Sequence, residues 1–171
     1  MNHSIASCLI PNSLAQHLGT EFFEIAFVTR DMEKSIQYLK ENLGASKVFR
    51  TQASYPNNKY MGRLVQNQLD FALVWIGNMF IEVIQPSPGD NPFDAYLTDP
   101  DRLMNFHHFA IQVSDWDKTV EDIHKAGYEF CFEGSGKAKF GFIDLTKEMG
   151  CMLEVIANGE EFFEKIKKGD Y

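Results

Sequence analysis

Apolar and polar positions alternate along the chain in a way that predicts two similar sets of elements. Each set opens with a period-two stretch rich in β-branched and aromatic residues, beginning at Glu24 and at His108, and such stretches indicate strands. Apolar residues at helical spacing follow at about 31–43 and 115–126, in each case behind an aspartate suited to cap a helix. Three more strand candidates follow each helix, namely 46–54, 69–77 and 79–85 in the first set and 128–133, 138–145 and 151–157 in the second. The pattern therefore predicts a βαβββ unit that occurs twice.

The two sets also match residue by residue. The segment Glu24–Ser35 aligns without a gap to His108–Thr119, an offset of 84 residues (108 − 24). Ile81–Ile84 reads Ile-Glu-Val-Ile and recurs as Leu-Glu-Val-Ile at Leu153–Ile156, an offset of 72 residues (153 − 81). A repeat with two different offsets indicates a duplicated module whose copies differ in loop length.

We expect the modules 21–86 and 106–158 to form one α+β domain over residues 21–158. In this arrangement an eight-stranded mixed sheet curls around a shared cleft, and the helices lie on the outside. The connector between the modules is rich in proline and glycine, with a short helix expected at about 92–98. Residues 1–20 are expected to be an N-terminal extension and residues 159–171 a helical tail.

The charge and cysteine content of the chain limit its partners. A formal net charge of −8, without a block of lysine and arginine, disfavours binding to nucleic acid or to anionic lipid. No stretch approaches the roughly 18 apolar residues of a membrane helix, and the three cysteines have no CxxC spacing. These features predict a cytoplasmic protein whose partners are small molecules or proteins, with a homodimer as one oligomeric option.

Four polar side chains occupy repeat-equivalent positions in the predicted strands. Successive side chains in a strand point to opposite faces, so Glu24 and His108 share one equivalent position, and Glu82 and Glu154 share another among apolar neighbours. If the modules pack about a pseudo-twofold axis, the four side chains converge. Three carboxylates would then repel one another unless protons or a cation neutralise them. Oxygen ligands with one imidazole suit Zn, Mn, Co, Ni or Fe, and the residues do not distinguish among these metals.

Simpler interpretations of the same residues stay open. Glu82 and Glu154 could be exposed acids on a solvated sheet face, and His108 could be a core histidine. Glu24 could pair with a cation or act as a base instead of binding a metal. His107 points to the other side of the strand from His108, which favours a structural role.

The chain resembles the vicinal-oxygen-chelate superfamily, which includes glyoxalase I, methylmalonyl-CoA epimerase, extradiol dioxygenases and bleomycin-resistance proteins. The similarity covers about residues 22–157 and is closest to the epimerases. It is carried by Phe80–Pro86, the Gly89–Pro92 turn, the Phe106–His108 segment, and Gly150 ahead of Leu153-Glu154. The resemblance implies that Glu24, Glu82, His108 and Glu154 bind one divalent metal.

Two positions depart from relatives in this superfamily. Epimerases have histidine where this chain has Glu24, which also removes a histidine from the triad used by extradiol dioxygenases and disfavours oxygenation. Glyoxalase I uses an arginine four residues after its first ligand, and that position is Val28 here.

The resemblance implies a metal-dependent isomerase, epimerase or lyase. The metal would polarise a substrate carbonyl and stabilise an enolate or enediolate after a carboxylate removes the neighbouring proton. Glu154 is the first candidate for this base and Glu24 the second. The substrate would be a small carbonyl compound, with an acyl-CoA as one option. The walls of its site are expected to include Phe80, Trp75, Phe140 and Phe142. The alternative is a non-catalytic small-molecule binding protein of the bleomycin-resistance type.

Overall fold

A computed structural model describes residues 14, 18, 21–54, 57–136, 138–157 and 160–168, and the expected extension at residues 1–20 lies outside them apart from Leu14 and Leu18. The chain divides into two compact units. We call residues 24–108 the central unit and residues 1–23 together with 109–171 the terminal unit. The class is α+β, as expected, and the described residues form ten strands.

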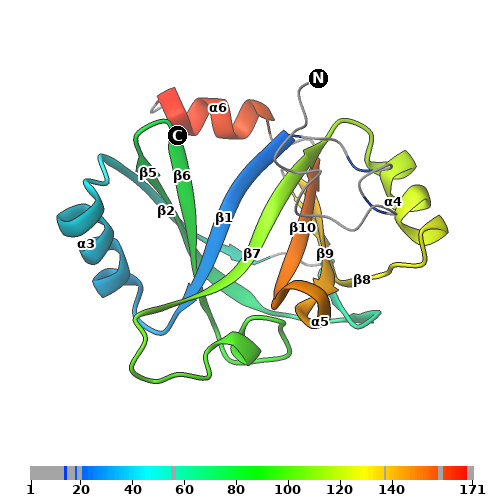
Figure 1. Ribbon diagram of the computed structural model, residues 1–171, viewed down its shortest axis with the longest axis horizontal. Coiled ribbons are helices and arrows are strands. Elements are labelled where there is room, and N and C mark those ends of the chain that lie inside the picture. Colours follow the sequence, from blue (N-terminus) through cyan, green and yellow to red (C-terminus); the bar gives the residue numbers. More distant parts are fainter. Residues whose placement is uncertain are drawn as a thin grey trace. The chain divides into compact units, whose positions relative to one another are not determined.

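The central unit contains a sheet with one long helix beside it (Figure 1). Its elements are β1 (Glu21–Thr29), which enters it at Glu24, α3 (Met32–Leu43), β2 (Lys47–Ser54), β3 (Lys59–Tyr60), β4 (Arg63–Leu64), β5 (Gln68–Ile76), β6 (Met79–Pro86), the 3-10 helix η1 (Asp94–Tyr96) and the start of β7 (Met104–Val113). The long strands lie in the order β2-β5-β6-β1. Strand β1 runs parallel to β6, and the pairs β2–β5 and β5–β6 are antiparallel.

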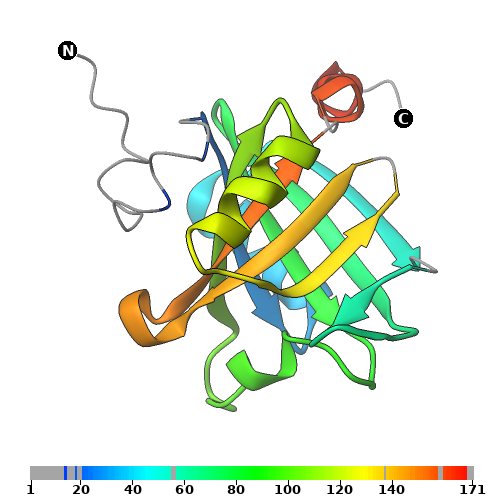
Figure 2. The ribbon, with the colours of Figure 1, turned by 90° about the vertical axis from the view of Figure 1, so that its right-hand side faces the viewer.

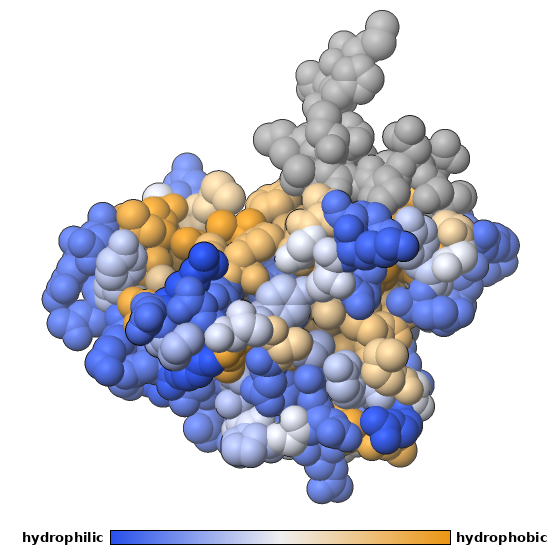
Figure 3. All heavy atoms as spheres, turned by 60° about the horizontal axis from the view of Figure 1, so that its bottom comes forward, coloured by the Kyte–Doolittle hydropathy of each residue, from blue (hydrophilic) through white to orange (hydrophobic). Residues whose placement is uncertain are grey.

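Helix α3 forms where the sequence places a cap before an apolar stripe. The Asp31 side chain accepts a hydrogen bond from the Lys34 backbone N–H at 3.0 Å, which satisfies one of the free donors at the helix start. The helix ends at Gly44, whose φ of 66° is left-handed and suits glycine. The stripe on α3 packs on one sheet face and forms a core of Met32, Ile36, Leu39, Ala72, Val74 and Val83. The outer face of α3 is hydrophilic, as the left side of Figure 3 shows.

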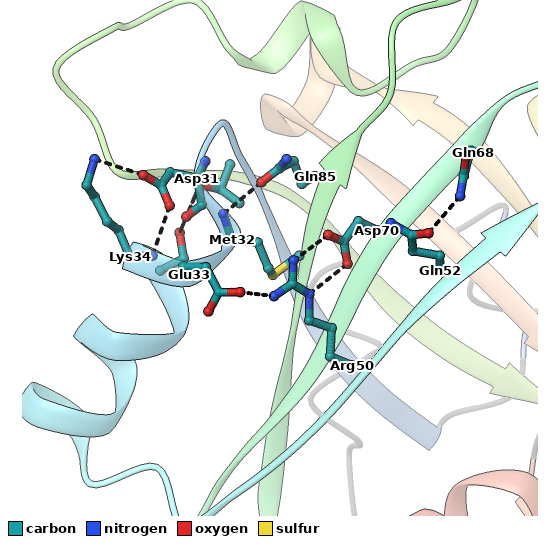
Figure 4. Close-up of polar contacts among 11 residues, drawn as sticks. Asp31, Met32, Glu33, Lys34, Arg50, Gln52, Gln68, Asp70 and Gln85 are labelled. Carbon is teal, nitrogen blue, oxygen red and sulfur yellow. Dashed lines mark hydrogen bonds and ion pairs between the residues drawn. The ribbon is translucent and has the colours of Figure 1, made fainter.

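A polar cluster fixes the start of α3 on this sheet face (Figure 4). Arg50 on β2 donates two hydrogen bonds to the Asp70 carboxylate on β5, at 2.9 and 2.6 Å, and also contacts Glu33 of α3. The Gln85 side chain accepts a hydrogen bond from the Met32 backbone N–H at 2.8 Å. Helix α3 covers this face of the sheet. Glu24 on β1 and Glu82 on β6 lie on the opposite face.

The terminal unit repeats the same plan. Its elements are residues 109–113 of β7, α4 (Trp116–Lys125), β8 (Phe130–Ser135), β9 (Lys139–Leu145), α5 (Thr146–Met149), β10 (Cys151–Ala157) and α6 (Glu160–Lys168). The strand order is β7-β10-β9-β8, and the pairs β9–β10 and β8–β9 are antiparallel. Asp115 caps α4 as Asp31 caps α3. Helix α4 lies beside the strands of this unit (Figure 2). Trp116 of α4 stacks on Phe130 of β8, with ring centroids 5.4 Å apart.

Most predicted elements are confirmed, including both long helices, η1 and the tail helix α6. The predicted strand count of eight is wrong, because the described part of the chain forms ten strands. The additional strands are β3 and β4, two residues each, joined by a turn in which Met61 and Gly62 have φ values of 50° and 74°. A strand of two residues is too short to show an alternation of apolar and polar positions in the sequence. None of the described helices has both the length and the apolar character needed to cross a membrane.

Candidate metal centre

Three of the four expected ligands lie in the central unit, and each comes from a different strand. Glu24 is on β1, Glu82 on β6 and His108 on β7. The parallel register pairs Ala26 with Glu82, and Ala26 shares its face with Glu24 two residues earlier. The antiparallel register pairs Glu82 with Leu73. Both glutamates therefore project from the sheet face opposite α3.

The three side chains converge closely enough to hold one ion. One oxygen of Glu24, one oxygen of Glu82 and one ring nitrogen of His108 all lie within 4.8 Å of one another. Nε2 of His108 lies 3.7 Å from an Oε2 of Glu82. Glu24 is 2% exposed and His108 0% exposed, whereas Glu82 remains 17% exposed. The predicted convergence of these three residues is thus observed.

His108 contributes an uncharged imidazole to this cluster. Burial lowers the pKa of His108 to about 3, so its ring is neutral at physiological pH and keeps one nitrogen lone pair. The contact between His108 and Glu82 is therefore not an ion pair. Two carboxylates beside a neutral imidazole are a donor set for a divalent cation of the zinc, manganese, cobalt, nickel or iron group, because such an ion offsets both negative charges and accepts nitrogen and oxygen ligands.

His107, the residue before His108 on β7, contacts the His108 ring. Its Nδ1 lies 2.8 Å from Nδ1 of His108, although the two side chains leave the strand on opposite faces. The ring packs against Phe93 at 4.8 Å and Tyr96 at 4.5 Å. Sequence reasoning gave His107 only a structural role. The Nδ1 atom of a histidine is close to the backbone, so the rings of two adjacent histidines can contact each other although their side chains leave the strand on opposite faces. The His107-His108 pair was the signal in the sequence that could have indicated this contact.

Glu154, the fourth expected ligand, lies on β10 of the terminal unit. It is paired with Phe142 of β9 in the strand register and is 6% exposed. The simpler interpretation, that Glu154 is an exposed acid on a solvated sheet face, is therefore wrong. Its participation in the metal centre stays a prediction.

Aromatic residues adjoin Glu82 on the same face of the central sheet. Trp75 and Phe80 are paired in the β5–β6 register, with ring centroids 5.2 Å apart. Phe80 precedes Glu82 by two residues and so points to the same side. The Lys47 ammonium lies 5.5 Å from the Trp75 ring. This part of the face combines an apolar surface with one cation.

Comparison with solved structures shows the same fold in several proteins. Methylmalonyl-CoA epimerase from Mycobacterium tuberculosis has a TM-score of 0.62 at 16% sequence identity, over 86% of this chain and 93% of the epimerase. A hypothetical protein from Bacillus halodurans C-125 has a TM-score of 0.59 at 17% identity, over 80% and 93%. A variant of Streptomyces coelicolor methylmalonyl-CoA epimerase in complex with 2-nitronate-propionyl-CoA has a TM-score of 0.58 at 14% identity, over 80% and 93%.

The sequence comparisons are consistent with this likeness of fold. A search of curated protein sequences gave no match. Residues 23–142, however, match the family model described as the Glyoxalase/Bleomycin resistance protein/Dioxygenase superfamily. That match spans well over half of the chain and includes the three converging residues. The protein therefore belongs to the glyoxalase/bleomycin resistance protein/dioxygenase superfamily.

Proposed function

We propose that the protein is a divalent-metal-dependent isomerase or epimerase that removes a proton next to a substrate carbonyl. The observation that carries this proposal is the convergence of Glu24, Glu82 and His108 within 4.8 Å on a buried sheet face. A structural ion pair would not need two carboxylates beside a neutral imidazole. We assign these three residues as metal ligands and Glu154 as the fourth, on the basis of its repeat equivalence to Glu82.

A divalent cation bound by these residues would act as a Lewis acid and stabilise the negative charge that develops on the carbonyl oxygen when the proton leaves. A carboxylate of the protein takes the proton, and the electron pair of the C–H bond moves toward the carbonyl. Delivery of a proton to the opposite face of the same carbon by a second acid gives the epimer, and return of the first proton to a neighbouring atom gives an isomer. The reaction consumes no other reagent.

Glu154 is our first candidate for the base, and Glu24 is the second. Both carboxylates are almost fully buried. A lyase reaction that begins with the same proton removal is compatible with this set of residues.

An acyl-CoA is the substrate class that we propose first. A relative by fold is a methylmalonyl-CoA epimerase in complex with 2-nitronate-propionyl-CoA. In this chain, the Trp75–Phe80 surface beside Glu82 would contact an apolar acyl group. The Lys47 ammonium above Trp75 would favour a substrate that also carries an anionic group.

Metal analysis and isotope exchange test this function together. We expect about one divalent ion per purified chain, and metal-dependent exchange of the α-proton of methylmalonyl-CoA in deuterated water. Glu82→Gln and His108→Ala should lose both the ion and the exchange. Glu121→Gln and His124→Ala are matched controls on α4 that should retain them, since both side chains are exposed. A protein without bound metal that still binds small molecules would instead favour a non-catalytic binding protein.

A further inference from the structure

We propose that Lys47 and Trp75 form a subsite that binds an oxyanion of the substrate. This inference deepens the proposed function, on which the identification of the bound molecule as a substrate rests. It starts from two donors that lie together on the central sheet. One is the Lys47 ammonium, 5.5 Å from the centroid of the Trp75 ring, and the other is the indole N–H of Trp75 itself.

The indole N–H of Trp75 is a buried donor. Trp75 is 6% exposed, and within the described part of the chain its Nε1 has no hydrogen-bond acceptor. A buried donor without an acceptor costs free energy, because it has lost its hydrogen bonds to water, and such groups are rare in folded proteins. A tryptophan N–H can only donate. We therefore expect an oxygen atom of a bound molecule to accept from it.

Lys47 adds a positive charge beside this donor. The two residues are directly paired in the β2–β5 register, so their side chains leave the sheet on the same face. An ammonium within about 6 Å of an aromatic centroid is attracted to the ring, which holds the lysine near Trp75. The indole N–H belongs to the same side chain, so one oxyanion can accept from both groups. A neutral carbonyl oxygen, in contrast, carries no charge for the ammonium to attract.

The subsite lies on the same sheet face as the candidate metal ligands of β1 and β6. Trp75 pairs with Phe80, and Glu82 follows Phe80 by two residues, so these side chains share one face. Lys47 stands two strands away from Glu82 in the order β2-β5-β6. Strand spacing and rise place the backbone positions of Lys47 and Glu82 about 12 Å apart. One small molecule can span this separation, but one functional group cannot reach both ends.

The surface between the two ends is apolar. The Trp75 and Phe80 ring centroids are 5.2 Å apart, and Leu73, which is 1% exposed, is paired with Glu82. Among the described residues of β2, β5 and β6, Lys47 is the only basic residue whose register position shares the face of Glu82. The substrate class that fits is a carbonyl compound with an oxyanion at the far end of an apolar segment. The oxyanion is a carboxylate or a phosphate.

Binding of short amphiphiles to the whole chain, treated with a chelator, tests the subsite. Octanoate and octyl phosphate carry an oxyanion on the same alkyl chain, and 1-octanol is the neutral control. In spectra of protein with ¹⁵N-labelled tryptophan, an oxyanion should shift the indole N–H signal of Trp75 and leave that of Trp116, on α4, in place. We expect 1-octanol to bind at least about 10-fold more weakly. The tighter oxyanion identifies the source. A response at Trp116 alone, or no preference over 1-octanol, would overturn the proposal.

This test needs neither a bound metal nor turnover. A protein that exchanges the substrate proton but does not prefer oxyanions would retain the proposed function and lose the subsite. A protein that prefers oxyanions at Trp75 but binds no metal would retain the subsite and lose the proposed function. The two failures are therefore distinguishable.

Substitutions separate the charge from the N–H. Lys47→Met keeps an unbranched side chain beside Trp75 but removes the charge, Lys47→Arg keeps the charge, and Trp75→Phe keeps a ring but removes the N–H. By isothermal titration we expect about a 10-fold loss of oxyanion affinity in Lys47→Met and Trp75→Phe, and recovery to within a few-fold in Lys47→Arg. Lys125→Met, at an exposed lysine on α4, is the control without loss. Unchanged affinity in Lys47→Met would contradict the proposal, even if Trp75→Phe fails to fold.

Discussion

The central and terminal units have a similar order of strands and helices, but they differ in the polar side chains on their strands. The central unit brings together two glutamates and a histidine from β1, β6 and β7. The terminal unit places Glu154 on β10 beside a cluster of Phe132, Phe140 and Phe142, whose ring centroids lie 5.8 to 6.0 Å apart. The order of elements is therefore repeated, while three of the four proposed ligands lie in the central unit.

The difference is sharpest at the paired positions of the opening strands. Phe23 and Glu24 of the first copy correspond to His107 and His108 of the second. One copy presents a carboxylate and the other a neutral imidazole that is contacted by a second imidazole. A metal centre built from unlike donors can thus arise from a symmetric fold by substitution at two adjacent positions.

The largest expected effect is on metal binding in the central unit. His108→Ala or Glu82→Gln should weaken binding of Co²⁺ or Zn²⁺ by more than about 100-fold, because a missing ligand costs more than a missing outer-shell partner. Isothermal titration measures this affinity. Retention of wild-type affinity by both variants would show that the three converging side chains do not form the site.

The next effect distinguishes the catalytic role of Glu154, in the terminal unit, from that of Glu24, in the central unit. Glu154→Gln should lower the rate of α-proton exchange by about 10²- to 10⁴-fold even in excess metal, the usual contribution of a positioned base. Glu24→Gln should do so mainly through weaker metal binding, so that excess metal restores part of the rate. Rates measured over a range of metal concentrations distinguish these cases, and the reverse pattern would assign the base to Glu24.

A stability effect follows from the two buried histidines. In the unfolded chain, histidine gains a proton near pH 6.5, whereas His108 in the fold stays neutral down to about pH 3. The unfolded state then binds more protons between these values, so the metal-free protein should lose stability as the pH falls from about 6.5 toward 3. Each such histidine contributes a slope of about 1.4 kcal/mol per pH unit.

Urea unfolding at several pH values measures this slope. His107→Phe should make it shallower, because the pKa of His107 is also lowered by burial and the substitution removes that group. A variant with an unchanged slope would indicate that His107 does not titrate with unfolding.

The sequence predicted the repeated elements and missed the short β3–β4 hairpin. Alternation and helical spacing located both long helices, and the repeat singled out Glu24, Glu82 and His108, because equivalent positions on equivalent strands project to equivalent faces. The β3–β4 hairpin was missed since its strands hold two residues each. His107 was assigned to packing alone, because strand alternation describes side-chain direction and not the reach of a ring atom near the backbone.

The smallest predicted effect compares Ala72 with Gly141, at equivalent positions beside the strand partners of Glu82 and Glu154. A Cβ at Gly141 would lie 2.7 Å from the Phe130 ring, whereas Ala72 packs in the core under α3. Gly141→Ala should destabilise the protein by about 1 to 3 kcal/mol through overpacking. Ala72→Gly should cost about 1 kcal/mol. Thermal unfolding measures both, and a neutral Gly141→Ala would indicate that the terminal unit can adapt where the glycine stands.

Crystals of the protein grown with Co²⁺, and measured at the cobalt absorption edge, test the metal assignment most directly. We predict one anomalous peak within about 2.0 to 2.2 Å of carboxylate oxygens of Glu24 and Glu82 and of Nε2 of His108. No peak at these side chains, or an ion bound only elsewhere, would contradict it.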